Sequence, residues 1–348
     1  MTPARGALPM RVGLIGCGTI AYWSHLRTLQ QLNGVTLAAA ADPDPIARAL
    51  AASIVRGPVY DQSSDLLLDD IDAVVISAPN ESHAELTVAA VRAGKHVYVE
   101  KPLATTASEA RSVVDVVSQS KVVATVGFNY RYHTAHQRAW ALLRNGRIGN
   151  VRVVQSAFCE PVSLQMMPEW KRRRASGGGA LLDLASHHID LLRWFLEDEV
   201  ATVYARITSS RTEHDGATLA LTMRGGVQAQ VYASFCAGPA DFLEFIGDRG
   251  VLRVDRHRVL PQLQLARSPL YGVRSAWSLP TMGEATVWAR RLVQPSYQPS
   301  FRRALQAFVQ RIGGQAVHMV TVEDGERSLA VVLAAEESAH LNLPVVVP

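Results

Sequence analysis

The sequence contains no run of about 18 apolar residues, the length that a helix needs to cross a bilayer. Its first ten residues, MTPARGALPM, also lack the apolar core and the small-residue cleavage site of a secretory signal. These two absences argue against a membrane-spanning protein and against a secreted one. We therefore expect a cytoplasmic protein with no membrane partner.

Cysteine is scarce in the chain. Its three cysteines, Cys17, Cys159 and Cys236, lie far apart and form no CxxC pair. This spacing argues against a disulfide framework and against a thiolate zinc site. We expect all three to be small buried apolar side chains.

The chain also lacks a strong charge of one sign, since charged residues make up 19% of it and the formal net charge is +4. The main basic cluster is the run Lys171 to Arg174, and no recognition motif accompanies it, so nucleic acid is not expected as a partner. The run is either a solvated loop or a contact for an anionic ligand, such as the phosphates of a nucleotide sugar.

The chain has enough apolar material for two cores, with 348 residues of which 48% are hydrophobic. From Met10 to Val126, short β-rich runs alternate with helical stretches, which predicts an α/β domain with a doubly wound parallel sheet. After Asn150, strand-like runs follow one another and predict an α+β domain with a large, mostly antiparallel sheet. We predict domains at 1–128 and 129–348, with a C-terminal helix near 322–340 able to pack back on the first domain.

A glycine motif follows the first strand-like run. Residues 16–21, GCGTIA, fit the pattern G-x-G-x-x-A, in which glycines allow a tight turn and a close approach to a pyrophosphate. The motif predicts dinucleotide contacts by Gly16, Gly18, Thr19 and Ile20. The structural alternative is a plain turn between a strand and a helix.

An aspartate at the end of the second strand-like run strengthens the dinucleotide prediction. Asp42 lies 21 residues beyond Ala21, where a carboxylate can accept hydrogen bonds from a ribose 2′-hydroxyl. It would repel a 2′-phosphate, and the following Pro43-Asp44-Pro45 supplies no Lys or Arg. We therefore predict NAD as the cofactor, with NADP the less favoured alternative. A helix N-cap is the structural alternative for Asp42.

Two further loops follow strand-like runs, at the edge where open α/β sheets bind ligands. They predict cofactor contacts by Ser77, Pro79, Asn80, His83, Glu100 and Lys101. Pro102 restricts the backbone of Lys101, and a lysine held there could reach a substrate hydroxyl. The alternative is an ordinary exposed loop lysine.

The stretch Gly177 to Trp194, GGGALLDLASHHIDLLRW, places acidic and imidazole groups inside an apolar helix. At about 100° per residue, His187 lies about 40° from Asp183 and shares its face with Asp190, whereas His188 points away. The polar stripe is either a solvated face or a catalytic one in which Asp183 orients His187 for proton transfer. A metal site is less favoured, because a third convincing ligand is missing.

These segments together resemble the Gfo/Idh/MocA family of sugar and cyclitol oxidoreductases over nearly the whole chain. The matching pieces are GLIGCGTIA, APNESH, VYVEKPLA, GFNYRYH, the loop Trp170 to Gly179, GGGALLDLASHHIDLLRW and VTVEDGERSLAVVLAAEESA. The order of EKP and D-x-x-x-H-x-x-D is the most specific part of the match.

The resemblance implies an N-terminal Rossmann domain and a C-terminal domain whose open sheet often forms the subunit interface, giving a homodimer or homotetramer. It implies NAD(P) bound between the domains and reversible oxidation of a secondary alcohol on a sugar, nucleotide sugar or cyclitol. Lys101, Asp183 and His187 match the catalytic positions and, with Arg131, the substrate-binding ones. Asn129, Trp170 and Arg172 match positions near the cofactor, and no metal is implied.

Two other functions fit the same motifs. One is a glycosidase that uses NAD for a transient oxidation and then eliminates a neighbouring group. The other is a non-catalytic regulator that binds NAD or a sugar. The joint presence of Lys101, Asp183 and His187 favours chemistry over sensing.

Overall fold

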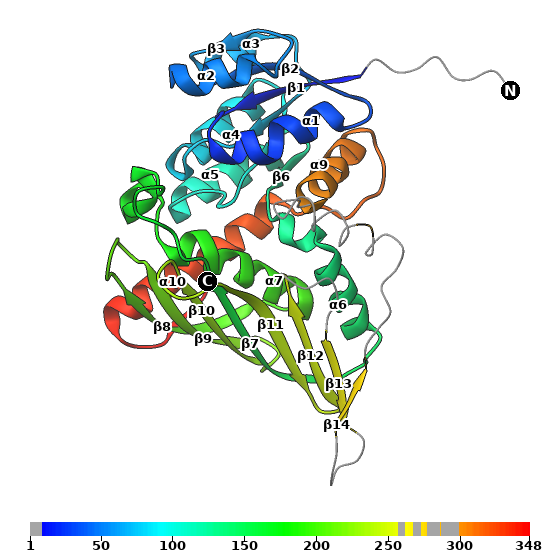
Figure 1. Cartoon of the computed structure of the whole chain (residues 1–348), viewed down its shortest axis with the longest axis vertical. Helices are drawn as coiled ribbons and strands as arrows, with labels where there is room; N and C mark the ends of the chain where they lie inside the picture. The colour runs from blue at the N-terminus through cyan, green and yellow to red at the C-terminus, as the bar shows by residue number, and fades with distance from the viewer. Residues whose placement is uncertain (1–8, 257–261, 267–272, 277–285, 287–298) are drawn as a thin grey trace, which may run out of the picture. The chain divides into compact units, whose positions relative to one another are not determined.

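The computed structural model describes residues 9–256, 262–266, 273–276, 286 and 299–348 (Figure 1). These residues divide into two compact units. Unit 1 runs to Gly127 and includes Phe301–Glu326, and unit 2 comprises Phe128–Ser300 and Arg327–Pro348. The sequence division assigned all of 129–348 to the second domain, whereas the structure assigns 301–326 to unit 1.

Unit 1 contains a six-stranded sheet in the order β3-β2-β1-β4-β5-β6, with every neighbouring pair parallel (Figure 1). The strands are β1 (Met10–Ile15), β2 (Val35–Ala41), β3 (Val59–Tyr60), β4 (Ala73–Ile76), β5 (His96–Val99) and β6 (Ala124–Val126). Strands β4 and β6 are buried throughout, as continuous apolar runs in a parallel sheet should be. The predicted doubly wound sheet is confirmed.

The helices of unit 1 follow the strands in alternation. They are η1 (Ala21–Leu26), α1 (Arg27–Gln31), α2 (Pro45–Ala52), α3 (Ser63–Leu68), η2 (Asn80–Ser82), α4 (His83–Arg92) and α5 (Ala107–Ser118). Helix α5 begins with a capping box between Thr106 and Glu109, which satisfies exposed backbone donors at its start.

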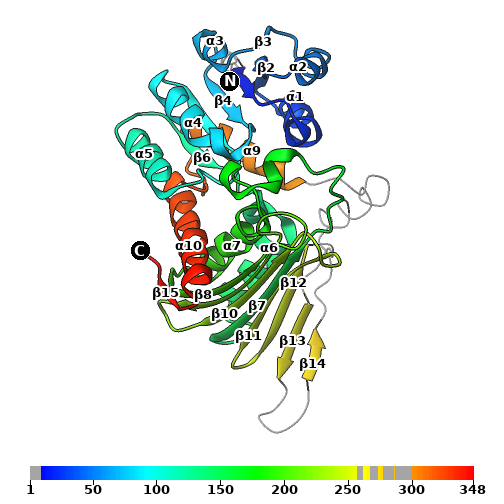
Figure 2. The same cartoon turned by 90° about the vertical axis from the view of Figure 1, so that its left-hand side faces the viewer.

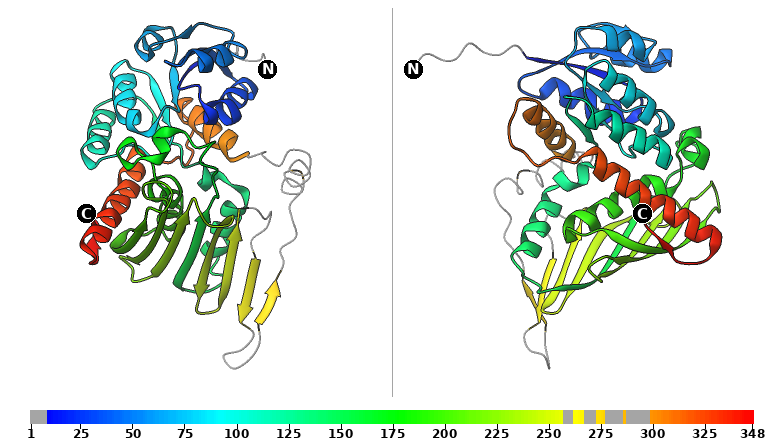
Figure 3. Two further views of the ribbon diagram at one scale, coloured as in Figure 1. Left: turned by 60° about the vertical axis from the view of Figure 1, so that its left-hand side comes forward. Right: turned by 180° about the vertical axis from the view of Figure 1, so that it is seen from behind.

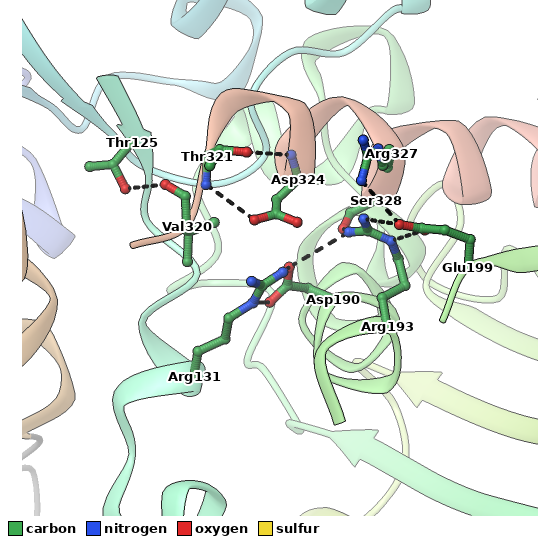
Figure 4. Close-up of polar contacts among 10 residues, drawn as sticks. All are labelled: Thr125, Arg131, Asp190, Arg193, Glu199, Val320, Thr321, Asp324, Arg327 and Ser328. Atoms are coloured by element: carbon green, nitrogen blue, oxygen red, sulfur yellow. Dashed lines mark hydrogen bonds and ion pairs between the residues drawn. The ribbon is translucent and has the colours of Figure 1, made fainter. Parts of the chain in front are cut away.

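The segment 301–326 returns to unit 1 after a long interval in the chain. It contains most of α9 (Pro299–Ile312), whose Phe308 packs against Tyr98 with ring centroids 6.0 Å apart. The hydroxyl of Thr125 donates to the carbonyl of Val320 at 2.7 Å (Figure 4). These contacts are long-range in sequence, so local pattern gave no sign of them.

Unit 2 contains a nine-stranded sheet in the order β14-β13-β12-β11-β7-β10-β9-β8-β15 (Figure 2). The strands are β7 (Val151–Cys159), β8 (Val200–Thr208), β9 (Gly216–Met223), β10 (Gln228–Ser234), β11 (Ala240–Gly247), β12 (Gly250–Asp255), β13 (Gln262–Ala266), β14 (Val273–Ala276) and β15 (Val345–Val346). Among the described strands, β7 and β10 pair in parallel and the other neighbours are antiparallel. The predicted large, mostly antiparallel sheet is confirmed.

Helices lie on one face of this sheet (Figures 2 and 3). They are α6 (Thr134–Arg144), α7 (Ser186–Leu196) and the unit 2 part of α10 (Val322–Leu341), with the short turns η3 (Asn129–Tyr132), η4 (Glu169–Arg172), η5 (Arg174–Ser176) and η6 (Leu181–Ala185). Strand β10 alternates exposed and buried residues, as a half-covered sheet requires. In the described part of unit 2, the second face carries no helix.

Two expectations about single features can be compared with the structure. Cys17 and Cys159 are buried as expected, but Cys236 is exposed, because it lies in the turn just beyond β10. Among the described residues, no helix combines the length and the apolar character needed to cross a membrane.

Candidate active site

The glycine motif forms a tight turn at the carboxyl end of β1. Gly16 has φ of +85°, and a Cβ atom there would lie 2.5 Å from the backbone nitrogen of Ala78, so no other residue fits. Gly18 is exposed, and a Cβ atom there would meet no heavy atom within 4 Å. Thr19 and Ile20 are exposed beside it. The turn therefore has the close backbone and open space that a pyrophosphate needs.

Asp42 follows β2 at the same edge of the sheet, and its carboxylate is held by the backbone. One oxygen accepts from the N–H of Cys17 at 2.6 Å and the other from the N–H of Asp44 at 2.8 Å. The N-cap of α2 is Asp44, which accepts from the N–H of Ile46 at 2.9 Å. The alternative of Asp42 as a helix N-cap is therefore wrong.

A cation that the sequence pattern did not reveal lies near Asp42. The guanidinium of Arg48, one turn into α2, donates to the backbone carbonyls of Asp42 and Pro43, both at 2.8 Å. The prediction of NAD rested on Asp42 and on the three residues after it, which include no Lys or Arg. Helical geometry returns Arg48 to this edge, so a positive charge is present there after all.

The loops after β4 and β5 are joined by a buried histidine. The ring of His83 lies between two backbone carbonyls, with Nδ1 2.7 Å from Pro102 O and Nε2 2.9 Å from Ala78 O. Burial lowers the pKa of His83, opposed by its hydrogen bonds to those carbonyls. His83 thus links the two loops through its own ring.

The other predicted residues of this edge have different settings. The hydroxyl of Ser77 donates to Gly16 O at 2.8 Å, Pro79 is exposed, and Asn80 is buried. Glu100 is buried and accepts from His25 Nε2 at 2.9 Å. Their contact with a cofactor stays a prediction.

Lys101 is half-buried directly after β5 and Glu100, and its peptide bond to Pro102 is cis. The structure thus places Lys101 beyond the carboxyl end of β5, an internal strand of the unit 1 sheet. This position is where open parallel sheets carry their functional groups.

In unit 2, the helix that carries the predicted catalytic pair is not a regular α-helix. Leu181–Ala185 form a π-helix, and α7 begins at Ser186. The predicted angle between Asp183 and His187 assumed α-helical geometry, and the wider turn of the π-helix changes it. Such turns are frequent at functional sites. His187 and Asp190 both lie within α7, so their shared face holds.

The solvated-face alternative for this helix is wrong. His187, His188 and Asp190 are all buried, and their exposed fractions are 7%, 0% and 1%. Asp190 accepts a bidentate contact from Arg131, with Nε–Oδ2 at 2.8 Å and Nη2–Oδ1 at 2.6 Å (Figure 4). Because ionised groups are buried only when paired, Arg131 and Asp190 fix η3 and α7 to each other.

Asp183 forms an ion pair that the sequence did not predict. Its Oδ2 lies 2.8 Å from Lys171 Nζ, and both residues are partly buried. The charge of Asp183 raises the pKa of Lys171 despite burial. Gly178 packs closely against the backbone of this lysine, because a Cβ atom there would lie 2.3 Å from Lys171 O.

The rest of the basic run is also paired. The side chain of Arg174 binds Glu336, and Arg172 and Arg173 each lie 3.4 Å from Glu169. Acidic partners therefore offset much of the run's charge. This weakens its interpretation as a phosphate site and excludes a fully solvated loop.

His187 lies in an aromatic enclosure. Its imidazole stacks on the ring of Tyr130, with centroids 4.1 Å apart and planes 15° apart. Phe128 and Phe158 pack at 6.1 Å and 6.0 Å from the imidazole. An aromatic ring flush against the imidazole restricts its rotation.

Asn129 and Trp170, which are predicted to lie near the cofactor, belong to unit 2. Asn129 is buried, and its Nδ2 donates to the Ser300 hydroxyl at 3.1 Å. Trp170 is half-exposed, with Lys171 Nζ 5.5 Å from its ring centroid. Their roles toward a cofactor stay predictions, as does substrate binding by Arg131.

A buried ionic group beneath α7 was missed altogether. Asp241 accepts from His188 Nε2 at 3.2 Å and from Arg256 Nε at 2.5 Å. The guanidinium of Arg256 lies 4.8 Å from the centroid of the Tyr130 ring. The partners come from segments far apart in the chain, so only the structure could reveal them. Among the described residues, no cluster of His, Cys, Asp or Glu is arranged to hold a metal.

The chain is similar to known proteins in both its N-terminal and its C-terminal part. The profile of the oxidoreductase family with an NAD-binding Rossmann fold matches residues 10–128, and that of the GFO/IDH/MocA C-terminal domain matches residues 136–253. A 1,5-anhydro-D-fructose reductase of Ensifer adhaerens is 31% identical, over 94% of this chain and 96% of the relative.

Two further relatives are named as enzymes that act on inositol, a cyclitol. An inositol 2-dehydrogenase of Pseudomonas fluorescens is 28% identical, over 94% of this chain and 93% of the relative. The crystal structure of a myo-inositol 2-dehydrogenase from Lactobacillus plantarum is 27% identical with a TM-score of 0.80, covering 98% of this chain and all of that one (100%). The chain therefore belongs to the Gfo/Idh/MocA family of oxidoreductases, with an NAD-binding Rossmann fold.

Proposed function

We propose that the protein is an NAD-dependent dehydrogenase or ketoreductase that interconverts a secondary alcohol and a ketone on a sugar or cyclitol. Membership of the family supports an oxidoreductase, and the relatives include an anhydrofructose reductase and inositol dehydrogenases. The observation that carries the proposal is the buried imidazole of His187, held in an aromatic enclosure on the helix that also presents Asp183.

The residues of unit 1 fit a dinucleotide. The open space over Gly18 and the exposed edge near Thr19 suit a pyrophosphate, and the carboxylate of Asp42 suits a ribose. A nicotinamide dinucleotide bound there would accept or donate the hydride. The protein's own residues bind it, orient the substrate and move the proton.

In the proposed reaction, His187 removes the proton of the reacting hydroxyl as the alcohol is oxidised, and returns it in the reverse direction. Lys101 donates a hydrogen bond to the same oxygen. Asp183 orients His187, and its ion pair with Lys171 holds that carboxylate in place. A positioned acid–base group of this kind typically contributes about 10²- to 10⁴-fold to the rate.

The ion pairs made by the basic run Lys171 to Arg174 bear on whether the substrate carries phosphate. A nucleotide sugar brings a diphosphate, and Arg174 and Lys171 are both committed to carboxylates. Uncharged sugars and cyclitols need hydroxyl-binding groups instead, such as carboxylates and a lysine. We therefore propose a substrate without phosphate.

The test is a binding and turnover experiment on the purified chain. NAD and NADP are titrated by protein fluorescence, and nicotinamide absorbance is then followed over a panel of cyclitols, free sugars, anhydrosugars and nucleotide sugars. We expect tighter binding of NAD and turnover of at least one phosphate-free substrate. Turnover of nucleotide sugars alone would contradict the substrate class, and glycosyl release without net redox change would favour the redox-elimination alternative. NAD or sugar binding without turnover of any substrate in the panel would instead favour the non-catalytic regulator.

A further inference from the structure

The ring of Tyr130 stacks on His187, the candidate catalytic histidine, and lies close to the guanidinium of Arg256. Its centroid lies 4.1 Å from that of the His187 imidazole, in a nearly parallel stack, and 4.8 Å from the Arg256 guanidinium. Tyr130 is 6% exposed, and Asp241 behind Arg256 is 1% exposed. All four residues belong to unit 2.

The charge states of Tyr130 and Asp241 follow from their surroundings. Burial, with a further contribution from Asp241, raises the pKa of Tyr130 well above its ordinary value, so the phenol is neutral. Burial would raise the pKa of Asp241, but the hydrogen bond from His188 and the charge of Arg256 lower it well below the ordinary range. Tyr130 therefore stacks on His187 as a neutral ring. The ion pair of Asp241 and Arg256 beside it stays charged.

The ion pair of Asp241 and Arg256 helps to hold the ring of Tyr130 in place. Asp241 anchors the Arg256 guanidinium from below with an Nε–Oδ2 contact of 2.5 Å. A guanidinium fixed near an aromatic ring attracts it through the ring quadrupole. Phe158 adds a tilted contact to Tyr130 at 5.8 Å. The plane of Tyr130 is thus set by groups other than His187.

We propose that Tyr130 is a positioning residue, which fixes the plane of the His187 imidazole so that its reacting nitrogen faces the substrate hydroxyl. Arg256, anchored by Asp241, in turn fixes Tyr130. The inference rests on the proposed role of His187 in proton transfer. The stacking ring, rather than the phenolic hydroxyl, is the part that acts.

The ring and the hydroxyl are separated by two substitutions. Tyr130→Phe retains the stack and removes only the hydroxyl, whereas Tyr130→Leu removes the ring. We expect Tyr130→Phe to keep kcat within about threefold of wild type. Tyr130→Leu should lower kcat by about 10- to 100-fold, with KM and NAD affinity little changed, because misorientation of one catalytic group has costs of this order.

The matched control is Phe195→Leu. Phe195 is a buried aromatic residue on the same helix α7, and its ring packs against Phe245 and His136. This variant loses a buried ring of similar size and so reports the effect of general destabilisation. We expect it to retain kcat while its melting temperature falls at least as much as that of Tyr130→Leu.

A nuclear magnetic resonance measurement tests the stack without any substrate. Imidazole protons held over an aromatic face are shifted upfield by the ring current, and the His187 signal is assigned by its absence in His187→Asn. The shift should persist in Tyr130→Phe and disappear in Tyr130→Leu. An intact stack in wild type with unaltered kcat in Tyr130→Leu would overturn the proposal. Full turnover by His187→Asn would instead refute the proton-transfer role, and the ring-current result would still stand.

Discussion

At the scale of single residues, the side chains of the candidate site are held by an ion pair and a ring stack that join separate segments of the chain. The sequence placed Gly16 and Asp42 just beyond the carboxyl ends of their strands, because the motif fixes backbone conformation over a short stretch. Their contact with a dinucleotide stays a prediction. The partners of Asp183 and His187 could not be predicted, because Lys171 and Tyr130 reach them through the folded chain. Pairing of buried charges is a property of tertiary structure, and local spacing carries no record of it.

The carboxylate of Asp42 carries the prediction about cofactor choice. Asp42→Ser should weaken NAD binding and lower the preference for NAD over NADP by about 10- to 100-fold, because a hydrogen bond to a charged group is worth about 1.5–3 kcal/mol. The nearby Arg48 guanidinium would then face a 2′-phosphate without an opposing carboxylate. Fluorescence titration with both dinucleotides measures the ratio.

The control for this experiment is Asp44→Ser, in which serine can still cap α2. It should leave the ratio of the two affinities unchanged. An equal preference for both dinucleotides in the wild-type protein would refute the role given to Asp42.

At the scale of elements, the periodic patterns predicted type and pairing but missed local irregularity. Alternation of strands and helices predicted the parallel sheet, and strand-like runs that follow one another predicted the mostly antiparallel one. The π-helix at Leu181–Ala185 was missed, because an apolar run such as ALLDLA suits both kinds of helix. Such insertions depend on packing around the helix, which sequence periodicity does not encode.

The face of the nine-stranded sheet that carries no helix in the described part of unit 2 leads to a prediction about assembly. Tyr232 is 42% exposed near the middle of the sheet, on β10 and opposite Thr218 of β9 and Ala157 of β7. We predict that this face joins two copies of the chain. Tyr232→Asp should weaken self-association at least about tenfold, because an unpaired charge in an interface costs several kcal/mol. Sedimentation velocity measures the change.

The control is Leu68→Asp, which places the same charge on an exposed residue of unit 1. It should leave the oligomeric state unaltered. A wild-type protein that sediments as a monomer at all concentrations, or an unaffected Tyr232→Asp variant, would show that the sheet face is not an interface.

At the scale of the whole molecule, the sequence yielded the fold class of both units but not the full path of the chain. The second half was assigned to one domain, whereas Phe301–Glu326 belongs to unit 1. The contacts responsible, such as Thr125 with Val320, join positions nearly two hundred residues apart (195 residues).

The most direct measurement is the turnover of His187→Asn with the best phosphate-free substrate of the panel and saturating NAD. The account predicts a fall in kcat of at least about 100-fold with NAD affinity retained. The proton acceptor is lost, whereas the glycine motif and Asp42 of unit 1 are unchanged. His340→Asn, an exposed histidine of α10, should retain full turnover. Wild-type turnover by His187→Asn would contradict the account.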